Sequence, residues 1–362
     1  MEHMTPADQA PKTAAPVTDL FDITIIGGGP VGLFAAFYAG LRHLKTKIID
    51  SLEELGGQLT ALYPEKYVFD VAGFPKILAR DLANNLISQA MQYHPTISLG
   101  EIVHHLDPVT QVPGHTEAIT STCYKVTTDK QTHYTRTLLL CAGAGAFSPK
   151  KLTLPEAEGL EHRGLYYACR SKADFAGKNL LIVGGGDSAV DWALNLADTA
   201  GHITLIHRRN QFRAHEDSLR QLQRTKARIL TFFELESLIA ANGDLTGAVI
   251  KNNQTQEIQT LNIDAVLVQI GFHSSLGPIK EWPLQIEKGS IRVNQHMETA
   301  LPGIFAAGDV ATFDGKLKLI ATGFGEAATA VNYAKHILDP HAKIFPGHSS
   351  EMTPQHDSIV TL

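Results

Sequence analysis

The sequence predicts an α/β protein with two Rossmann-like, three-layer dinucleotide-binding domains, the first of them discontinuous, and a C-terminal extension. Three segments support this prediction. FDITIIGGGPVGLFAAFYAGLRHLKTKIID, from residue 21, has the order strand, glycine turn, helix, strand, and KNLLIVGGGDSAVDWALNLADTAGHITLIHRR, from residue 178, repeats that order. LPGIFAAGDV, from residue 301, forms a third strand and turn. A chain of 362 residues has room for two domains.

Composition and charge narrow the class of protein. Hydrophobic residues make up 44% of the chain and charged residues 19%, as in an ordinary globular protein. The net charge of −6 favours neither nucleic acid nor an anionic membrane surface. No apolar run reaches the roughly 18 residues of a membrane span. The three cysteines, Cys123, Cys141 and Cys169, are too scattered for a disulfide framework. We therefore expect a cytoplasmic protein without a metal site.

The first ordered element follows an arm of residues 1–20 that is rich in Pro, Ala and Thr and is expected to be disordered. Residues 23–26 predict a buried parallel strand, and residues 47–50 predict the next one. Pro30 suits the first position of the helix between them, because its missing N–H costs little there. Small residues would let this helix lie close to a sheet: Gly32, Ala35, Ala36 and Ala39.

The first glycine turn fits the GxGxxG fingerprint of dinucleotide-binding sites. Gly27 permits a tight turn, Gly29 lets the backbone approach a pyrophosphate, and Gly32 permits close packing of helix on strand. Asp50 ends the next strand, where a carboxylate can accept hydrogen bonds from ribose hydroxyls. The site suits a dinucleotide with a free 2′-hydroxyl, such as FAD. The alternative is a purely structural turn.

The second glycine turn differs from the first in the residues that follow it. The turn and the start of its helix supply Gly184, Gly186, Asp187 and Ser188. At the offset where the first site has Asp50, the chain has a basic cluster: His207, Arg208, Arg209 and Arg213. Guanidinium groups bind a 2′-phosphate bidentately, whereas a carboxylate would repel it. The second site is therefore predicted to bind NADPH; the alternative is a solvated basic loop.

The third segment returns the chain to the first domain. Gly308 permits close contact with a ligand, and the carboxylate of Asp309 can accept a hydrogen bond from a ribitol hydroxyl. The following helix would direct its positive N-terminal end at the flavin pyrimidine ring. We expect an FAD-binding domain of residues 21–147 and 294–338, an NADPH-binding domain of residues 148–293, and an extension of residues 339–362.

These motifs make the chain similar to the two-dinucleotide-binding-domain flavoproteins, and among them to the low-molecular-weight thioredoxin reductases. The glycine turns, HRRNQFRA and GIFAAGDV all match. Thioredoxin reductases carry a Cys-x-x-Cys pair just ahead of the second dinucleotide-binding strand. The aligned residues here are Tyr167, Ala168, Cys169 and Arg170, so one thiol remains. A single thiol cannot form the internal disulfide that passes two electrons onward. Electrons delivered to the flavin are therefore expected to leave directly from its ring.

The chain more closely resembles the thioredoxin-reductase-like ferredoxin–NADP reductases. The resemblance covers about residues 21–350 and rests on GGQLTALYPEKYVFDVAGFPK, GGGDSAVDWA, HRRNQFRAHE, IGFHSSLGPIK and KIFPGHSS. It implies a homodimeric flavoprotein that exchanges electrons between NADP(H) and ferredoxin. Hydride would pass between nicotinamide and flavin N5, and single electrons between flavin and iron–sulfur protein. Side chains would bind and orient the groups rather than act as acid, base or nucleophile.

The resemblance also implies roles for individual residues. Tyr63 would stack on one face of the isoalloxazine, unless it is only a core tyrosine. Either Phe345 or His348, in the extension of the partner subunit, would cover the other face. Further FAD contacts are implied for Asp50, Gln58, Val103, Phe147, Asp309 and Ser350. Because two stacked groups exclude the nicotinamide, the C-terminal group is expected to move and the two domains to rotate.

Other functions are compatible with parts of this pattern. An NADPH-dependent disulfide or peroxide reductase, like thioredoxin reductase, would use Cys169 with an external thiol. A redox sensor would need the nucleotide sites but no turnover, and an oxygen-reducing oxidase is a third alternative. Ferredoxins are usually acidic, so basic residues of the first domain are candidates for the docking surface: Arg42, Lys45, Lys47, Lys66, Lys76 and Arg80.

Overall fold

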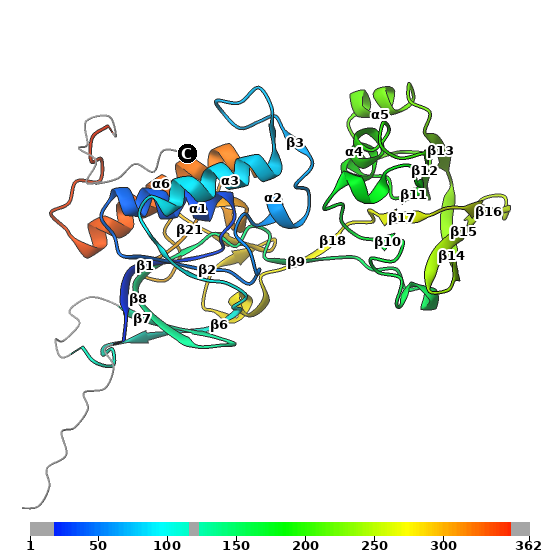
Figure 1. Ribbon diagram of the computed structural model, residues 1–362. Coiled ribbons are helices and arrows are strands. Elements are labelled where there is room, and N and C mark those ends of the chain that lie inside the picture. Colours follow the sequence, from blue (N-terminus) through cyan, green and yellow to red (C-terminus); the bar gives the residue numbers. More distant parts are fainter. Residues whose placement is uncertain (1–17, 116–122, 349–362) are drawn as a thin grey trace, which may run out of the picture.

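The computed structural model describes residues 18–115 and 123–348, and these residues form two lobes (Figure 1). The first lobe contains the N-terminal glycine turn and the last helix of the chain, and the second lobe contains the repeated turn. Two antiparallel strands, β9 (Ala146–Pro149) and β18 (Phe272–Ser275), join the lobes. None of the helices in the described part of the chain is long and apolar enough to cross a bilayer.

A seven-stranded sheet forms the centre of the first lobe. Its order is β5–β2–β1–β8–β7–β6, and β21 also pairs with β8. The strands around β1 run parallel, whereas β6 and β7 are antiparallel. The strands are β1 (Leu20–Ile26), β2 (Thr46–Ile49), β5 (Thr96–Ser98), β6 (Val103–Val109), β7 (Cys123–Thr128), β8 (Thr132–Leu140) and β21 (Ile304–Ala306). β1 thus begins at Leu20, inside the arm that we expected to be disordered.

Three helices lie side by side over one face of this sheet (Figure 1): α1 (Pro30–Leu41), α3 (Ala79–Met91) and α6 (Ile320–Leu338). Pro30 is the first residue of α1, as predicted. The small residues of α1 predicted to face the sheet are buried: Gly32, Ala35, Ala36 and Ala39. Their small volume brings the N-terminus of α1 close to the ends of β1 and β2, where the glycine turn lies.

The second lobe has three layers. A parallel sheet of order β10–β17–β11–β12–β13 is flanked on one side by helices and on the other by the antiparallel sheet β14–β15–β16. Alternate residues of β11 separate the two cores: Leu180 and Ile182 pack with Trp192 of α4, whereas Leu181 and Val183 pack with residues of β14 and β15. The elements are β10 (Leu165–Tyr166), β11 (Asn179–Val183), α4 (Asp187–Asn195), β12 (His202–His207), α5 (Glu216–Leu222), β13 (Arg228–Thr231), β14 (Phe233–Ala241), β15 (Asp244–Asn252), β16 (Ile258–Asn262) and β17 (Ala265–Val268).

The chain returns to the first lobe earlier than the sequence suggested. We expected residues 148–293 to belong to the second domain, but the segment after β18 packs in the core of the first lobe. Its buried residues there are Leu276, Ile279, Trp282, Ile291 and Val293. The nearest glycine-rich motif lies further on, at LPGIFAAGDV, so no local motif marks the earlier return.

Shorter elements complete the structure. In the first lobe they are α2 (Gln58–Ala61), the hairpin strands β3 (Tyr67–Val68) and β4 (Ile77–Leu78), β19 (Ile286–Glu287), β20 (Ser290–Arg292) and β22 (Ala311–Thr312). Four 3₁₀ turns cover Pro155–Ala157, Lys172–Phe175, Gly277–Glu281 and Gly308–Val310.

Candidate cofactor sites

A cavity of about 430 Å³ lies at the carboxyl ends of β1 and β2 in the first lobe. Such an edge of a parallel sheet is the usual place for a nucleotide. Seven residues singled out from the sequence line this single cavity: Gly27, Gly29, Asp50, Gln58, Tyr63, Val103 and Asp309. The structure therefore brings together residues from five separate segments of the chain.

The glycine turn allows the close approach that the sequence predicted. Gly27 has φ +108°, and a Cβ there would collide with the carbonyl of Cys141. A Cβ on Gly32 would collide with the carbonyl of Gly27, so Gly32 supports the turn although it does not line the cavity. Gly29 precedes α1 without a capping side chain, which leaves the helix N-terminus open toward the cavity.

Asp50 is held at the cavity wall by the backbone around it. Its Oδ2 accepts from Gly28 N–H at 2.5 Å and its Oδ1 from Leu52 N–H at 2.9 Å. Burial raises the pKa of Asp50 above its usual value, and the backbone N–H groups of Leu52, Gly28 and Ser51 only partly oppose this. A ribose hydroxyl donating to this carboxylate would favour its ionised form.

The opposite wall is the turn that contains Asp309, together with the N-terminus of α6. Gly308 N–H donates to Oε2 of Glu326 at 2.8 Å, and Glu326 forms a buried ion pair with Lys316. This pair anchors the Asp309 turn to α6. Leu319 and Ile320, at the start of α6, also line the cavity, and α6 has no capping side chain there. The positive end of the helix therefore faces the cavity, as predicted.

Gly323 and Gly325 of α6 provide a matched test of this wall. A Cβ on Gly323 would meet the Val31 side chain and the Gly308 backbone, whereas a Cβ on Gly325 would meet nothing within 4 Å. We expect Gly323→Ala to destabilise the protein by about 1–3 kcal/mol through overpacking. Gly325→Ala should stabilise it by about 0.5–1 kcal/mol, because alanine is the better helix former. Urea unfolding followed by circular dichroism measures both changes, and equal effects would show that the packing at Gly323 adapts freely.

Tyr63 lies where the two lobes meet. It lines the cavity and packs against both the core of the first lobe and the Trp192 core of the second. Burial raises the pKa of Tyr63 to about 12, so the ring stays neutral. Beside it, Lys66 pairs with Asp191 of α4 at 3.0 Å, and its ammonium lies 5.5 Å from the centre of the Trp192 ring. This contact joins the two lobes in the present arrangement.

The cavity has the chemistry that FAD needs. Asp50 could accept a hydrogen bond from a ribose hydroxyl and Asp309 from a ribitol hydroxyl, and the open N-terminal ends of α1 and α6 are positive. The remaining lining is largely apolar and includes Leu276, Pro278 and Ile279. The residues present therefore fit the cofactor.

The second glycine turn has the same backbone design. Gly184 has φ +155°, and a Cβ there would meet the carbonyl of Gln269. Gly186 precedes α4, in which Asp187 and Ser188 are the first two residues. Asp187 Oδ1 accepts from His215 N–H at 3.1 Å, which ties the basic loop to the start of the helix.

The arginines of the basic loop surround the end of β12. Arg213 N–H donates to the Gly185 carbonyl at 2.7 Å, and Asn253 donates to the Arg208 carbonyl at 2.9 Å. Within residues 18–115 and 123–348, no ion pair involves Arg208, Arg209 or Arg213, and all three side chains are exposed. Burial, together with these three charges, lowers the pKa of His207, so its imidazole is neutral at pH 7. The loop is an open anion site beside a helix N-terminus.

Four residues predicted to contact the flavin are not among the described lining of the cavity. Phe345 and His348 form an edge-to-face pair with ring centres 5.5 Å apart, and neither is part of the described lining of the cavity. The nearby Lys343 carbonyl accepts from Arg42 at 2.7 Å, at the end of α1 remote from the glycine turn. Phe147 belongs to β9, and Ser350 lies outside the described residues.

Several lining residues were missed by the sequence analysis. Glu101 and Ile102 precede β6, and Lys318 precedes α6; none stands in a glycine motif. Lys318, which donates to Ser290 Oγ at 3.1 Å, could have been found from its place just before a helix aimed at the flavin. Glu101 offered no such local signal, since its position depends on strands far away in the sequence.

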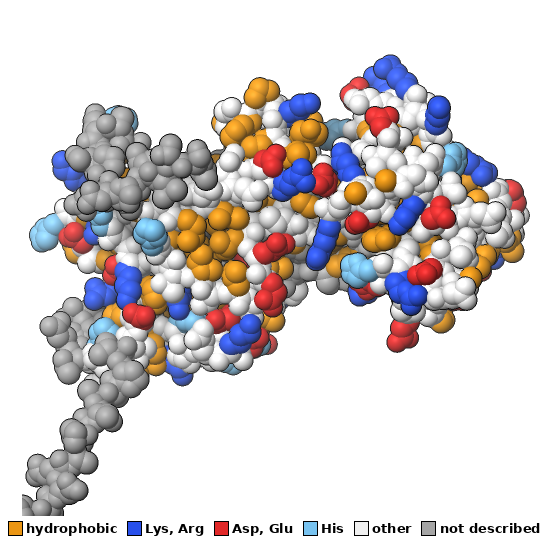
Figure 2. Space-filling view, viewed as in Figure 1, with side chains coloured by type: hydrophobic (Ala, Val, Ile, Leu, Met, Phe, Trp, Pro, Cys, Tyr) orange, Lys and Arg blue, Asp and Glu red, His pale blue; other side chains and the backbone are white. Residues whose placement is uncertain are grey.

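The predicted basic docking residues are largely engaged in other contacts. Arg42 and Lys47 are buried and cannot meet a partner. Three others pair with carboxylates, in Lys45–Asp19, Lys66–Asp191 and Arg80–Glu65, and the Lys76 ammonium lies over the Tyr67 ring. Figure 2 shows positive and negative side chains interspersed over the visible face. The sequence-based docking candidates therefore do not form a single basic patch.

The cysteines do not form a thiol centre. All three are free and buried, and burial raises the pKa of Cys169 to about 12. Cys169 packs in the core that contains Trp192. In the part of the chain that the structure describes, no cluster of His, Cys, Asp and Glu could hold a metal ion.

Comparisons with known proteins agree with this geometry. The profile of the family described as pyridine nucleotide-disulphide oxidoreductase matches residues 21–333. A ferredoxin–NADP reductase from Halalkalibacterium halodurans is 52% identical over 334 residues, which are 92% of this chain and 98% of that protein. A ferredoxin–NADP reductase 2 from Shouchella clausii is 51% identical with the same coverage. The thioredoxin reductase structure from Lactococcus lactis has a TM-score of 0.71 at 24% identity and covers 88% of this chain and 99% of that one. It shares the fold.

Proposed function

Because the chain belongs to the pyridine nucleotide-disulphide oxidoreductase family, and within it to the ferredoxin–NADP reductases, we propose that it exchanges electrons between NADP(H) and ferredoxin with FAD as cofactor. The observation that carries this proposal is the lone, buried Cys169 at the position of the thiol pair of thioredoxin reductases. Without a thiol pair, the chain has no internal disulfide through which to pass two electrons.

The residues of the second lobe bind and orient NADPH. Arg208, Arg209 and Arg213 provide guanidinium groups for the 2′-phosphate, which distinguishes NADPH from NADH. The open N-terminus of α4 after Gly186 accepts the pyrophosphate. His207, neutral at pH 7, adds no charge of its own to this site.

The residues of the first lobe hold FAD by both ends. Asp50 accepts from the adenosine ribose, the N-terminus of α1 faces the pyrophosphate, and Asp309 accepts from the ribitol. When bound at these residues, FAD would supply the redox chemistry: acceptance of hydride from NADPH and exchange of single electrons with an iron–sulfur protein. Tyr63 covers one face of the flavin, and the N-terminus of α6 stabilises negative charge on its pyrimidine ring.

Anaerobic reduction of the purified protein by NADPH, followed by transfer to ferredoxin and then cytochrome c, tests this function. We expect a yellow protein that bleaches with NADPH and reduces cytochrome c only when ferredoxin is present. A Cys169→Ser variant should behave like the parent. A colourless protein would contradict the proposal. So would rapid thioredoxin reduction that the Cys169→Ser variant loses, which would favour the disulfide reductase.

The proposal includes a homodimer in which the extension of one subunit reaches the flavin of the other. The segment around Lys343 is held at the end of α1 opposite the glycine turn. Phe345 is 65% exposed there, so its ring is free to contact a partner subunit. A partner subunit would bring a flavin face to this ring or to His348.

The three free cysteines fit a cytoplasmic location, which is also part of the proposal.

Truncation before Phe345 tests the role of the extension. We expect hydride transfer from NADPH to the flavin to be about tenfold faster in the truncated protein, because no covering group has to move before the nicotinamide reaches the flavin. The flavin absorption spectrum should shift at the same time, as a stacked ring is removed. Stopped-flow reduction by NADPH measures the rate of hydride transfer, and the absorption spectrum of the oxidised protein measures the shift. Unchanged rates with an unchanged spectrum would show that the extension covers no flavin.

A further inference from the structure

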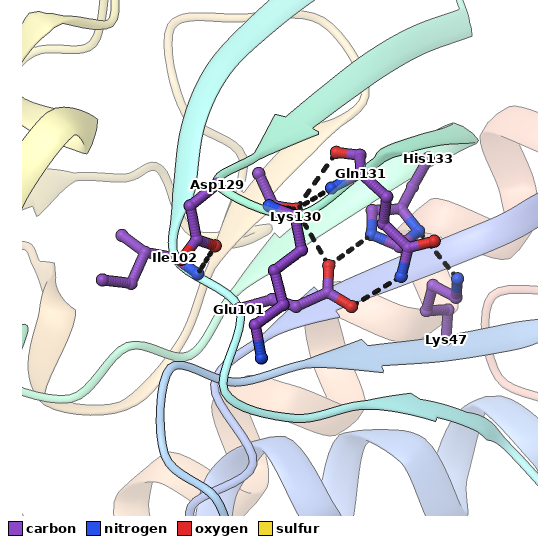
Figure 3. A network of polar contacts seen from close by, with 8 residues as sticks. Lys47, Glu101, Ile102, Asp129, Lys130, Gln131 and His133 are labelled. Atoms are coloured by element: carbon purple, nitrogen blue, oxygen red, sulfur yellow. Dashed lines mark hydrogen bonds and ion pairs between the residues drawn. The ribbon is translucent and has the colours of Figure 1, made fainter.

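A buried group of charged and polar side chains lies directly behind the cavity wall formed by residues 101–103 (Figure 3). Lys47 of β2 contacts Nδ1 of His133 on β8 at 2.8 Å, and His133 Nε2 contacts Oε2 of Glu101 at 2.8 Å. An ammonium can only donate, so Nδ1 accepts and Nε2 carries the hydrogen given to Glu101. We call these three residues, with Thr128 and Gln131, the Glu101 network.

The Glu101 carboxylate is fully engaged by protein donors. Oε1 accepts from Gln131 at 2.6 Å, and Oε2 accepts from Thr128 at 2.9 Å as well as from His133. Burial alone would raise the pKa of Glu101, but these hydrogen bonds outweigh it and lower the pKa, so the group stays ionised. Although Glu101 lines the cavity, its carboxylate is committed to the network rather than to a ligand.

The backbone of Glu101 connects the network to the ribose-binding residue. Glu101 N–H donates to the Asp50 carbonyl at 2.9 Å, and Asp50 N–H donates to the Ser98 carbonyl at 2.9 Å. Ile102 N–H is fixed by Asp129 at 2.7 Å. The segment that faces the adenosine end of the cavity is thus held against the Asp50 loop from behind.

Burying these charges is costly. Glu101, His133 and Lys47 are all at most 8% exposed, and a buried ion pair is often no better for stability than an apolar core of the same size. Such a network can instead fix the position of backbone that must bind precisely. Here the cavity wall of residues 101–103 contains Glu101 of the network, and its backbone is hydrogen-bonded to Asp50.

We propose that Glu101, His133 and Lys47 are positioning residues for the adenosine half of FAD, a step that rests on the FAD site proposed above. The network holds residues 101–103 and Asp50 in the arrangement that receives adenine and ribose. Its removal weakens binding of the adenosine half and leaves the flavin half of the site, around Tyr63 and Asp309, unaffected.

Dissociation constants of FAD and FMN for the apoprotein, measured by flavin fluorescence, distinguish this role from general stabilisation. FMN lacks the adenosine half. We expect Glu101→Gln to raise the dissociation constant of FAD about tenfold or more, the size of a lost buried charged hydrogen bond, and that of FMN less than twofold. Lys47→Met should likewise raise the dissociation constant of FAD more than that of FMN.

Lys45 provides a matched control. The Lys45 and Lys47 ammonium groups each lie 4.8 Å from the centre of the Phe21 ring, but Lys45 is exposed and pairs with Asp19. Lys45→Met should leave both dissociation constants unchanged. If Lys47→Met does not fold, Gln131→Leu can replace it, because this variant removes one exposed donor to Glu101. It should raise the dissociation constant of FAD relative to that of FMN by a smaller factor.

The outcomes separate this inference from the proposed function. A parent protein that binds no FAD would contradict the proposed function itself. Tight FAD binding by the parent with an unchanged constant in Glu101→Gln would overturn the positioning role. Equal losses of FAD and FMN affinity would overturn it too, because they indicate that the network only stabilises the fold.

Discussion

Replacement of Arg208 and Arg209 together by alanine is expected to raise the KM for NADPH about 100-fold or more and to leave the KM for NADH nearly unchanged. Each exposed guanidinium contributes a charged hydrogen bond to the 2′-phosphate worth about 1.5–3 kcal/mol, or roughly tenfold or more in affinity. Both side chains are free of ion pairs in the described structure, so no internal contact is lost. Steady-state kinetics with both nucleotides measures the change.

Arg224, an exposed arginine just after α5, serves as the control for this pair. Arg224→Ala also removes one positive charge from the second lobe. It should change the KM for NADPH and the KM for NADH by no more than about twofold, because exposed charges at a distance are screened. If the double variant kept its preference for NADPH, the loop would be the solvated basic segment that the sequence left open, and the nucleotide would bind elsewhere.

Replacement of Asp50 by asparagine is expected to weaken FAD binding about 100-fold. The carboxylate accepts from Gly28 and Leu52 N–H and has lone pairs left for ribose hydroxyls. An asparagine of the same shape must turn a donor toward one of these donors, which leaves a buried group unsatisfied. Equilibrium dialysis of the apoprotein with FAD measures the loss, and Asp19→Asn, at an exposed aspartate, should have no effect.

The affinity for FAD should also depend on pH through Asp50. Burial raises the pKa of this carboxyl in the free protein, and ribose donors favour its ionised form. The affinity for FAD is therefore highest at pH values above the raised pKa of Asp50. It falls by about tenfold per pH unit as the pH drops below that pKa. In Asp50→Asn this dependence should disappear. A parent and variant with identical pH profiles would show that another group controls binding.

The FAD cavity was predictable because its key residues occur in short, local patterns. Strand, turn and helix follow one another within about 30 residues, so the spacing from Gly27 to Asp50 fixes where each lies. The same argument placed the arginine cluster at the end of β12. Asp187 shows the limit of this reasoning, since the motif did not reveal that its carboxylate accepts from the backbone of His215 in the basic loop.

Residues without such a local pattern could not be placed. Lys47 was a candidate for a ferredoxin contact because ferredoxins are usually acidic, yet it is buried beside His133, 86 residues further along the chain. Leu276 and Ile279 were assigned to the second domain, and they pack in the first. In each case the deciding contact joins segments that are distant in sequence.

The sequence by itself determined the two nucleotide sites, their different preferences for FAD and NADPH, and the lack of a thiol pair. These three features depend on the identity and spacing of residues that are close in the sequence. Within a strand, turn and helix, that spacing fixes where each residue lies. Only the tertiary structure decided that Glu101 is buried against His133, that Tyr63 lies between the lobes, and that Phe345 is remote from the cavity of its own chain. Burial and pairing arise from packing between distant segments, and no local pattern in the chain encodes them.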